Sequence, residues 1–316
     1  MLIAEALLLD YSKLSFWLLF IPTLFVIAYH SWWILPYTRL HSREVSQADH
    51  LDAENSIKIM TANVLMHNKN VEKLIALVNE NDPDILVTLE TNQWWQNQLK
   101  VIESDYPYRI SCPQENLYGM HVYSRYVLSE SITEFLVEDT IPSMHTLLTL
   151  PSGQNIRVHF LHPAPPSPTE NDESSERDAE LIMIAKSVAK ADIPVIVTGD
   201  LNDVAWSTTT RLFRKISQLS DPRIGRGMFN TFHADYWFMR WPLDHLFHSR
   251  HFKLYDIRRL SHFGSDHFAL LTQLIYTTSS VENSGSELEA TKEDVNLARQ
   301  KMASENVKQN DVPSPT

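Results

Sequence analysis

Acidic, amide and imidazole side chains stand directly after several strand-like segments of this sequence. In VIVTGDLNDV (195–204), four apolar or β-branched residues lead into a glycine. The polar residues that follow are Asp200, Asn202 and Asp203. Carboxylates can bind a cation or align a water molecule, and an amide can donate hydrogen bonds to an anion. A buried strand that ends in this way carries such groups to one edge of a sheet.

Other predicted strands end in the same kinds of residue. The full set is Asn63, Glu90, His162, Asp200 with Asn202, Asp244 with His245, and Asp266 with His267. If these strand ends lie along one rim, their side chains converge in one cleft, where open α/β sheets usually hold their ligands. Each residue alone has a simpler interpretation: Glu90 as an acid near a helix N-terminus, Asn63 as a turn residue, and His162 as a core histidine. The complete set favours a functional site.

The segments that would position these residues alternate between strands and helices, and hairpins appear in the middle. Strands are predicted over 57–65, 84–90, 120–125, 145–162 (two strands around a Pro-Ser-Gly turn), 195–198, 243–248 and 265–276. Helices are predicted over 71–81, 92–102, 176–191 and 207–219. This mixture predicts α/β layers around mixed sheets rather than a parallel barrel.

Composition sets limits on the function. The chain has 316 residues, of which 43% are hydrophobic, so it can bury a large core. A net charge of −12 argues against an extended basic surface for sequence-blind nucleic-acid binding, although a local basic groove remains compatible with it. Cys112 is the single cysteine, which excludes an intrachain disulfide, and we expect a packing or surface role for it.

The stretch from Leu14 to Thr38 contains no Asp, Glu, Lys or Arg. It is longer than the roughly 20 residues that a helix needs to cross a membrane, so we predict one transmembrane span. Aromatic residues suited to a membrane interface stand near its end: Trp32, Trp33 and Tyr37. A cleaved signal peptide is the alternative, but no small-residue cleavage site follows.

Four regions follow from these patterns. We predict a membrane anchor over 1–45 with its span at about 14–38, a polar linker over 46–55, one domain over 56–276, and a disordered tail over 277–316. A helix over 287–304 is the alternative for part of the tail. Basic residues on the two sides of the span differ by only one, so the side on which the domain lies stays open.

Seven motifs, in order, resemble the endonuclease/exonuclease/phosphatase family, the metal-dependent phosphoesterases related to pancreatic-type DNases. They are TANVL, LVTLET, GMHVYSR, LHPAPP, VIVTGDLNDV, WPLDHLF and GSDHFAL, within about residues 56–276. Four longer strings, RDAEL, GDLNDVAWS, DPRIGRG and FNTFHA, are similar to a membrane-tethered bacterial branch. The resemblance implies a two-sheet α/β sandwich of the DNase-like type and a single-pass protein of the bacterial inner membrane.

The resemblance also implies a divalent cation, Mg²⁺ or Mn²⁺. Hydrolysis of a phosphodiester requires charge neutralisation on the phosphoryl oxygens and a positioned water, and hard cations prefer oxygen ligands. Glu90 is the first expected ligand, Asn63 adds its amide oxygen or holds the phosphate, and Asp266 assists. No cysteine occurs in these motifs, which argues against a thiolate zinc site.

The remaining motif residues receive roles by family position. Asp200 aligns the attacking water, while Asn202 and His162 donate hydrogen bonds to the phosphate. His267 acts as general base or phosphate contact. Because neighbouring residues on a strand point to opposite faces, Asp244 is expected to orient His267 in place of the residue directly before it. Asp203, which faces away from Asn202 in an extended chain, is expected to cap the next helix.

The chain departs from the family pattern at His245, where many members have tyrosine, so a second imidazole is expected near the site. In LYGMHVYSR, packing or surface roles are as good an interpretation as catalysis for Tyr118, His121 and Arg125.

The substrate is the least determined feature. Nucleic acid is the first expectation, and a phospholipid or sphingolipid headgroup is the second because of the anchor and the acidic charge. Six aromatic rings in FNTFHADYWFMRWPL (229–243) could stack bases, contact lipid chains or fill the core. A third hypothesis is a non-catalytic binding module with the same fold. No protein partner is implied.

Overall fold

The computed structural model describes three ranges of the chain: 12–165, 174–278 and 289–307. Parts of the predicted anchor and of the predicted tail lie outside the described residues, namely 1–11, 279–288 and 308–316.

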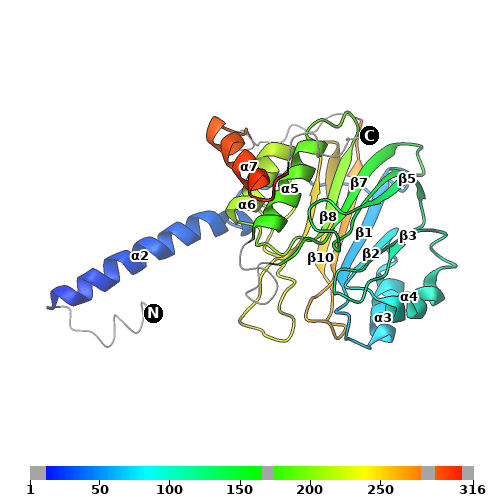
Figure 1. Cartoon of the computed structure of the whole chain (residues 1–316), viewed down its shortest axis with the longest axis horizontal. Coiled ribbons are helices and arrows are strands. Elements are labelled where there is room, and N and C mark those ends of the chain that lie inside the picture. The colour runs from blue at the N-terminus through cyan, green and yellow to red at the C-terminus, as the bar shows by residue number, and fades with distance from the viewer. Residues whose placement is uncertain (1–11, 166–173, 279–288, 308–316) are drawn as a thin grey trace.

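Two mixed β-sheets form the centre of the protein (Figure 1). The first sheet has the order β10 (Phe252–Arg259), β11 (Leu270–Tyr276), β1 (Ser56–Asn63), β2 (Ile85–Leu89), β4 (Met120–Ser124) and β3 (Tyr108–Cys112). The second has the order β5 (Val127–Glu134), β6 (Ser143–Thr149), β7 (Asn155–Leu161), β8 (Val195–Asp200) and β9 (Asp244–His248). Only the pairs β1–β2 and β7–β8 run parallel among these strands. The predicted α/β sandwich with mixed sheets is confirmed.

Apolar side chains hold the layers together. Between the sheets, Ile59 and Val87 of the first sheet belong to one buried cluster with Val158 and Ile196 of the second. Residues of opposite parity on β1 and β2, such as Met60, face the outer helices instead. This alternation follows from the pleat of a strand, in which successive side chains point to opposite faces. Strands β2 and β8 are buried throughout because each has a sheet on one face and helices on the other.

Helices cover the outer face of each sheet (Figure 1). The first sheet carries α3 (Val71–Asn81) and α4 (Gln93–Gln98), which continues as a 3-10 turn at Leu99–Ile102. The second carries α5 (Ser175–Val188) and α6 (Thr208–Ser217). Local capping explains two of these boundaries, since Asn92 accepts a hydrogen bond from Trp95 N at the start of α4 and Ser207 accepts one from Thr210 N at the start of α6.

Helix α2 (Leu14–Ile34), followed by a 3-10 turn at Leu35–Tyr37, projects away from the sandwich (Figure 1). It is the one helix of the described residues that is long and apolar enough to cross a membrane, which by itself is weak evidence for a span. Most of its apolar side chains are exposed; Leu14, Phe25 and Trp32 are examples. A helix that is apolar all round and unpacked is unfavourable in water, which is compatible with the predicted span.

The structure differs from the predicted disordered tail over Lys292–Ser304, which form helix α7. Its Ala298 and Met302, one helical turn apart, are buried with residues of α5 and α6. A capping box between Thr291 and Asp294 starts the helix. Few apolar residues are sufficient to hold this helix in place, because they lie on one face of it and pack against the apolar surface of α5.

The segment predicted as a polar linker packs against the domain in the structure. Ala48 is buried, and Ala48 N donates to Leu254 O at 2.8 Å while Leu254 N donates to Ser46 O at 3.0 Å. The segment therefore runs along β10. Strands β3, β5 and β10 were not among the predicted elements; β3 and β5 expose most of their residues and lack a clear apolar alternation.

Candidate active site

Register brings the predicted polar residues to one edge of the sandwich. In the parallel pair β1–β2, Asn63 lies opposite Leu89, which places Glu90 just beyond it. In the antiparallel pair β8–β9, Asp200 lies directly opposite Asp244. The two sheets meet close behind this edge, where Thr61 and Thr198 share a hydrogen bond of 3.0 Å.

Gly199 allows β7 and β8 to approach closely at this edge. A Cβ atom at this position would lie 1.8 Å from Leu161 O, which no side chain can accommodate. The close approach carries His162, the residue after β7, to the same place as Asp200. His162 Nε2 lies 4.0 Å from Asp200 Oδ2, and the ring of Tyr118 lies 5.5 Å from the His162 ring. Tyr118 therefore borders the site.

Asp200, His267 and Asp244 form a buried charged row. His267 Nδ1 donates to Asp244 Oδ2 at 2.8 Å, and His267 Nε2 lies 3.5 Å from Asp200 Oδ2. The contact with Asp244 is the one that strand alternation predicts. The physical reason differs, however, because Ser265 and Asp266 lie in a bend before β11 and not in a strand.

The charges in this row stabilise a protonated imidazole. Burial by itself lowers the pKa of His267, but the carboxylates of Asp200 and Asp244 outweigh it and raise this pKa to about 10. Burial raises the pKa of Asp200, and the two neighbouring imidazoles, with hydrogen bonds, reverse this and leave it below its usual value. Burial keeps the pKa of Asp244 raised. The two carboxylates therefore favour the protonated form of His267, in which both ring nitrogens donate hydrogen bonds.

The same three residues offer ligand atoms within 4.8 Å of one another, a spacing that a metal ion could occupy. Two features argue against metal ligation by His267. Its Nδ1 is already bound to Asp244, and a protonated imidazole has no lone pair for a cation. The row is better described as a histidine that is ion-paired with two carboxylates and donates hydrogen bonds.

Glu90 lies beside this row and is joined to Asp200 through the amide of Asn63. Asn63 Nδ2 donates to Glu90 Oε1 at 2.7 Å and to Asp200 Oδ2 at 3.2 Å, so the amide joins the two carboxylates. Asn63 Oδ1 already accepts from Leu65 N at 3.0 Å. Burial, and to a lesser extent the charge of Asp266, raises the pKa of Glu90 to about 7. Glu90 Oε2 is buried, and no described residue donates a hydrogen bond to it.

Ser265, Thr231 and Phe232 also build the site, although the sequence analysis did not assign them a role. Ser265 Oγ donates to Asn63 O at 2.8 Å and accepts from His267 N at 3.1 Å, which ties β1 to the bend. Thr231 Oγ1 accepts from Asp244 N at 3.2 Å, and the Phe232 ring lies 4.9 Å from the His267 ring. The sequence held one signal for the role of Ser265: it stands two residues before His267, a spacing at which a serine hydroxyl can accept a hydrogen bond from the backbone.

The loop after β8 takes a left-handed turn at Asn202, whose φ is 51°. Asn202 N donates to Asp200 Oδ1 at 3.0 Å, and Asn202 Nδ2 donates to Pro163 O at 2.9 Å. The expected phosphate donor thus holds the loop after β7 in this structure, which leaves its second amide hydrogen available. Asp203 Oδ2 accepts from Thr210 Oγ1 at 3.2 Å and from the Ser207 hydroxyl, so it supports the start of α6.

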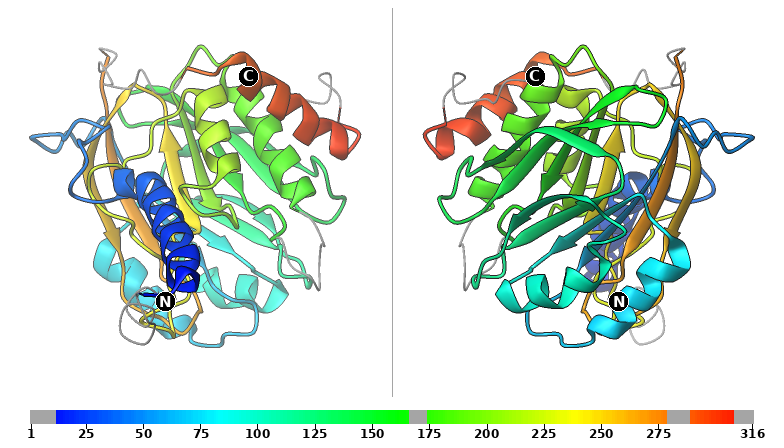
Figure 2. Two further views of the ribbon diagram at one scale, coloured as in Figure 1. Left: turned by 90° about the vertical axis from the view of Figure 1, so that its left-hand side faces the viewer. Right: turned by 90° about the vertical axis from the view of Figure 1, so that its right-hand side faces the viewer.

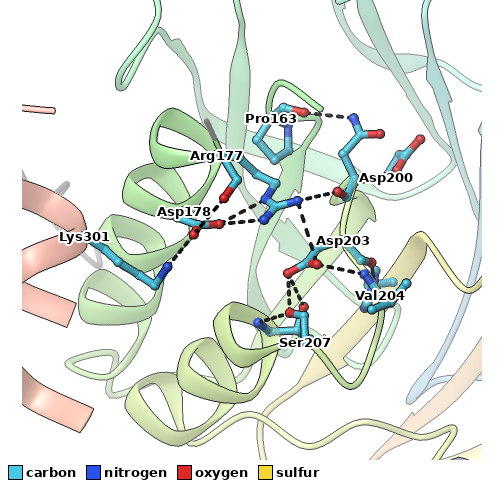
Figure 3. A network of polar contacts seen from close by, with 12 residues as sticks. Pro163, Arg177, Asp178, Asp200, Asp203, Val204, Ser207 and Lys301 are labelled. Carbon is cyan, nitrogen blue, oxygen red and sulfur yellow. Dashed lines mark hydrogen bonds and ion pairs between the residues drawn. The ribbon is translucent and has the colours of Figure 1, made fainter. Parts of the chain in front are cut away.

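A buried arginine joins this loop to the C-terminal helix (Figure 3). Arg177 of α5 donates to Asn202 O at 2.7 Å and to Asp178 Oδ1 at 2.8 Å, and it lies 3.8 Å from Asp203 Oδ1. Lys301 of α7 pairs with Asp178 from the other side. Arg177 and Asp178 occur in the string RDAEL, but the sequence analysis gave neither of them a role.

Three motif residues lie away from the row. His245 follows Asp244 on β9 and points to the opposite face, where Arg223 Nη2 donates to its Nδ1 at 2.6 Å and its Nε2 donates to Asp203 O at 2.8 Å. Burial lowers its pKa to about 3, so His245 does not add a charged imidazole to the site. His121 is buried and bonded to the Thr91 hydroxyl, and Arg125 pairs with Asp82 near the surface.

Comparison with known proteins gives the class of this fold and site. The model of the endonuclease/exonuclease/phosphatase family matches residues 60–267, and the chain belongs to that family. Enzymes of the family are metal-dependent hydrolases of phosphate esters. Among curated protein sequences, none matches the chain.

Solved structures show the same fold at low identity. The human Nocturnin catalytic domain with bound sulfate is 18% identical with a TM-score of 0.58, covering 72% of this chain and 97% of its own. Zebrafish (D. rerio) TDP2 with a single-strand DNA product is 15% identical with a TM-score of 0.55, covering 69% and 98%. A family protein from Bacteroides thetaiotaomicron is 16% identical with a TM-score of 0.56, covering 72% and 98%.

Proposed function

We propose that this chain is a membrane-anchored, divalent-metal-dependent phosphoesterase that hydrolyses phosphodiester bonds in the manner of a nuclease. The observation that carries the proposal is the buried row of Asp200, His267 and Asp244, which lies near the carboxylates of Glu90 and Asp266. Phosphodiester hydrolysis needs three groups: a positively charged hydrogen-bond donor for the phosphate, a carboxylate that accepts a proton from water, and an acidic site that binds a metal ion.

The residues present fit Mg²⁺ or Mn²⁺ near Glu90. Its Oε2 is a buried acceptor without a hydrogen-bond partner among the described residues. Burial and the charge of Asp266 raise its pKa, although the Asn63 hydrogen bond and the charge of His267 oppose this rise. Glu90 and Asp266 would hold the cation, and Asn63 would orient Glu90. An oxygen-only donor set suits these hard cations. When bound, the cation neutralises charge on the phosphoryl oxygens.

Each side chain of the row has a distinct task in this proposal. Asp200 is ionised and accepts a proton from the attacking water at Oδ2. His267 donates Nε2–H to a phosphoryl oxygen, while Asp244 holds Nδ1–H and fixes the ring. His162 Nε2 and the second amide hydrogen of Asn202 donate to the same phosphate. Because two carboxylates raise the pKa of His267, we assign it as a donor and assign the role of base to Asp200.

Nucleic acid is the proposed substrate class. Its support is family membership together with a fold shared with TDP2, whose structure holds a single-strand DNA product. A lipid headgroup is the second candidate, and it has one specific observation in its favour. Trp237 is 82% exposed and Phe238 is 64% exposed, in the loop that packs Phe232 against His267. Exposed aromatic side chains next to a catalytic row could contact acyl chains.

The anchor in this proposal is α2, placed in the bacterial inner membrane as the motif strings suggest. Its support is the length, the apolar composition and the exposure of the helix.

The test is a substrate screen with the full-length chain in non-ionic detergent with Mg²⁺. Single-strand DNA, double-strand DNA, RNA, a phospholipid and a phosphosugar are compared, and Asp200→Asn, which preserves shape, serves as the matched control. We expect Mg²⁺-dependent cleavage of a nucleic acid that Asp200→Asn loses. Cleavage of the phospholipid alone would favour the second candidate, and no turnover of any substrate with either Mg²⁺ or Mn²⁺ would refute the enzymatic function.

A further inference from the structure

Two adjoining cavities flank the end of α2, where the chain enters the domain. The first, of about 680 Å³, is lined by residues of α2, α6 and α7, including Trp32, Trp33 and Arg211. The second, of about 630 Å³, lies between residues 39–47, Arg226 and β10. His41 and Ser42 line both cavities, so the two adjoin where the chain leaves α2; together their lining residues are called the collar below.

The first cavity combines apolar walls with one arginine that has no direct ion pair among the described residues. Arg214 is bound by Glu44 at 2.5 Å, and Lys215 is paired with Asp294 at 2.8 Å. Arg211 differs, because no described carboxylate lies within ion-pair distance of it. Its guanidinium lies 3.4 Å from the centre of the Trp33 ring and donates to Ser207 O at 3.1 Å. The charge of Asp294 acts on Arg211 only across the cavity that both residues line, so Arg211 has no direct ion pair there.

The second cavity is also short of anions. Arg39 and Arg43 are exposed, and neither they nor Arg226 form an ion pair with a described residue. Burial, and then the positive charge of Arg43, lowers the pKa of Arg226 to about 10. Asp256 lines this cavity as well, but it is already paired with Arg258 at 2.6 Å. Positive groups held near one another without an acid make a site for an external anion.

The position of the collar identifies the kind of anion. The collar lies beside the end of the apolar helix that the proposed function places in the membrane, and α6 and α7 lie on the face from which that helix projects (Figure 2). Trp32 and Trp33 stand at this end, at the level where aromatic side chains meet lipid headgroups. The protein as a whole carries a charge of −12, so an anionic membrane would repel the domain unless local cations compensated.

We propose that this collar binds the phosphate headgroups of anionic phospholipids and so holds the domain against the membrane. The proposal rests on the anchoring part of the proposed function and is independent of the catalytic part. Arg39, Arg43, Arg211 and Arg226 supply the positive charge. Trp32, Leu35 and Leu297 supply apolar contacts that a free phosphate ion would not use.

The test measures lipid retention by the full-length chain in non-ionic detergent. Phosphatidylglycerol or phosphatidylcholine is added, and bound lipid is counted by native mass spectrometry. The variant is Arg39→Gln with Arg43→Gln, two exposed side chains whose replacement should leave folding intact. The control is Lys190→Gln with Arg250→Gln, which removes the same charge from exposed positions that line neither cavity.

We expect preferential retention of phosphatidylglycerol. The affinity should fall roughly fivefold for each arginine removed, or about 25-fold for the pair, and stay unchanged in the control. Hydrolysis of a soluble phosphodiester should be the same in all three proteins, because these arginines lie outside the catalytic row.

Three results would overturn the proposal. Equal retention of the two lipids, or an equal loss in the control, would show that the collar has no preference for anionic headgroups. Inorganic phosphate binding as tightly as phosphatidylglycerol would assign the collar to a soluble anion. Recovery of the wild-type chain in aqueous buffer without detergent would remove the anchor and the lipid site together, while leaving the phosphoesterase activity to be judged by turnover.

Discussion

Replacement of Arg177 tests whether the buried network of Figure 3 positions the loop after β8, which carries the proposed catalytic residues. Arg177→Met keeps the length and apolar stem of the side chain but removes its charge and its donors. The variant loses the hydrogen bond to Asn202 O at 2.7 Å and the pair with Asp203 at 3.8 Å. Asp178 keeps Lys301 as a partner. The perturbation therefore falls mainly on the loop that carries Asp200 and Asn202.

The size of the effect follows from burial. Removal of one partner of a buried ion pair costs about 3–5 kcal/mol of unfolding free energy. Because Lys301 remains, we expect the lower end, about 3 kcal/mol. For a domain of 150–250 residues this lowers Tm by roughly 6–12 °C. A displacement of the loop by about 1 Å would lower kcat by up to about 100-fold, with a smaller change in KM.

Thermal unfolding followed by circular dichroism measures the first effect, and steady-state kinetics well below Tm measure the second. Arg299→Met, an exposed arginine on α7, is the control and should change neither quantity. Combining Arg177→Met with Asp178→Asn should cost less than the sum of the single changes, since the pair is coupled. A lowered Tm with an unchanged kcat would refute the positioning role and leave the network a structural one.

Three further predictions concern the metal, the catalytic row and the anchor. Glu90 has a pKa raised from 4.5 to about 7, so between these values the metal-free folded state binds more protons than the unfolded state, and stability should fall as pH rises through this window. Added Mg²⁺ should therefore raise Tm more at pH 8 than at pH 5.5, and Glu90→Gln should abolish the difference; an equal shift at both pH values would contradict the metal assignment. Asp200→Asn and His267→Ala should each lower kcat more than they raise KM, and the double variant should lose far less than the product of the single losses, whereas raised KM with unchanged kcat would favour a binding module. Deletion of residues 1–38 should release a soluble, active domain, but deletion to residue 48 should destabilise it, because Glu44 is lost and Arg214 stays buried without its partner. Equal Tm values for the two truncated forms would show that the Glu44 pair contributes nothing.

Local sequence patterns were sufficient to predict the position of the helices and strands that have strong apolar periodicity. The helix predicted over 71–81 is α3 (Val71–Asn81), since apolar residues recur at helical spacing and Asp82 ends it in a left-handed conformation. The buried strand before Asp200 was recognisable as an apolar run ending at a glycine. Strands β3 and β5 were missed because exposed edge strands carry little apolar alternation.

The sequence by itself determined which residue types reach the edge of the sandwich, because strand length and alternation place Asn63, Glu90, Asp200 and Asp244 at strand ends. Alternation also accounts for His245 facing away from Asp244. The tertiary structure decided which of these groups meet. His267 lies between two carboxylates from β8 and β9, and that arrangement raises the pKa of a residue that the sequence offered as a base. The docking of α7 and the bond from Arg177 to the catalytic loop likewise join segments far apart in the chain. Periodicity describes the face of one element, whereas a pKa and a partner depend on the burial and charge that other elements bring to it.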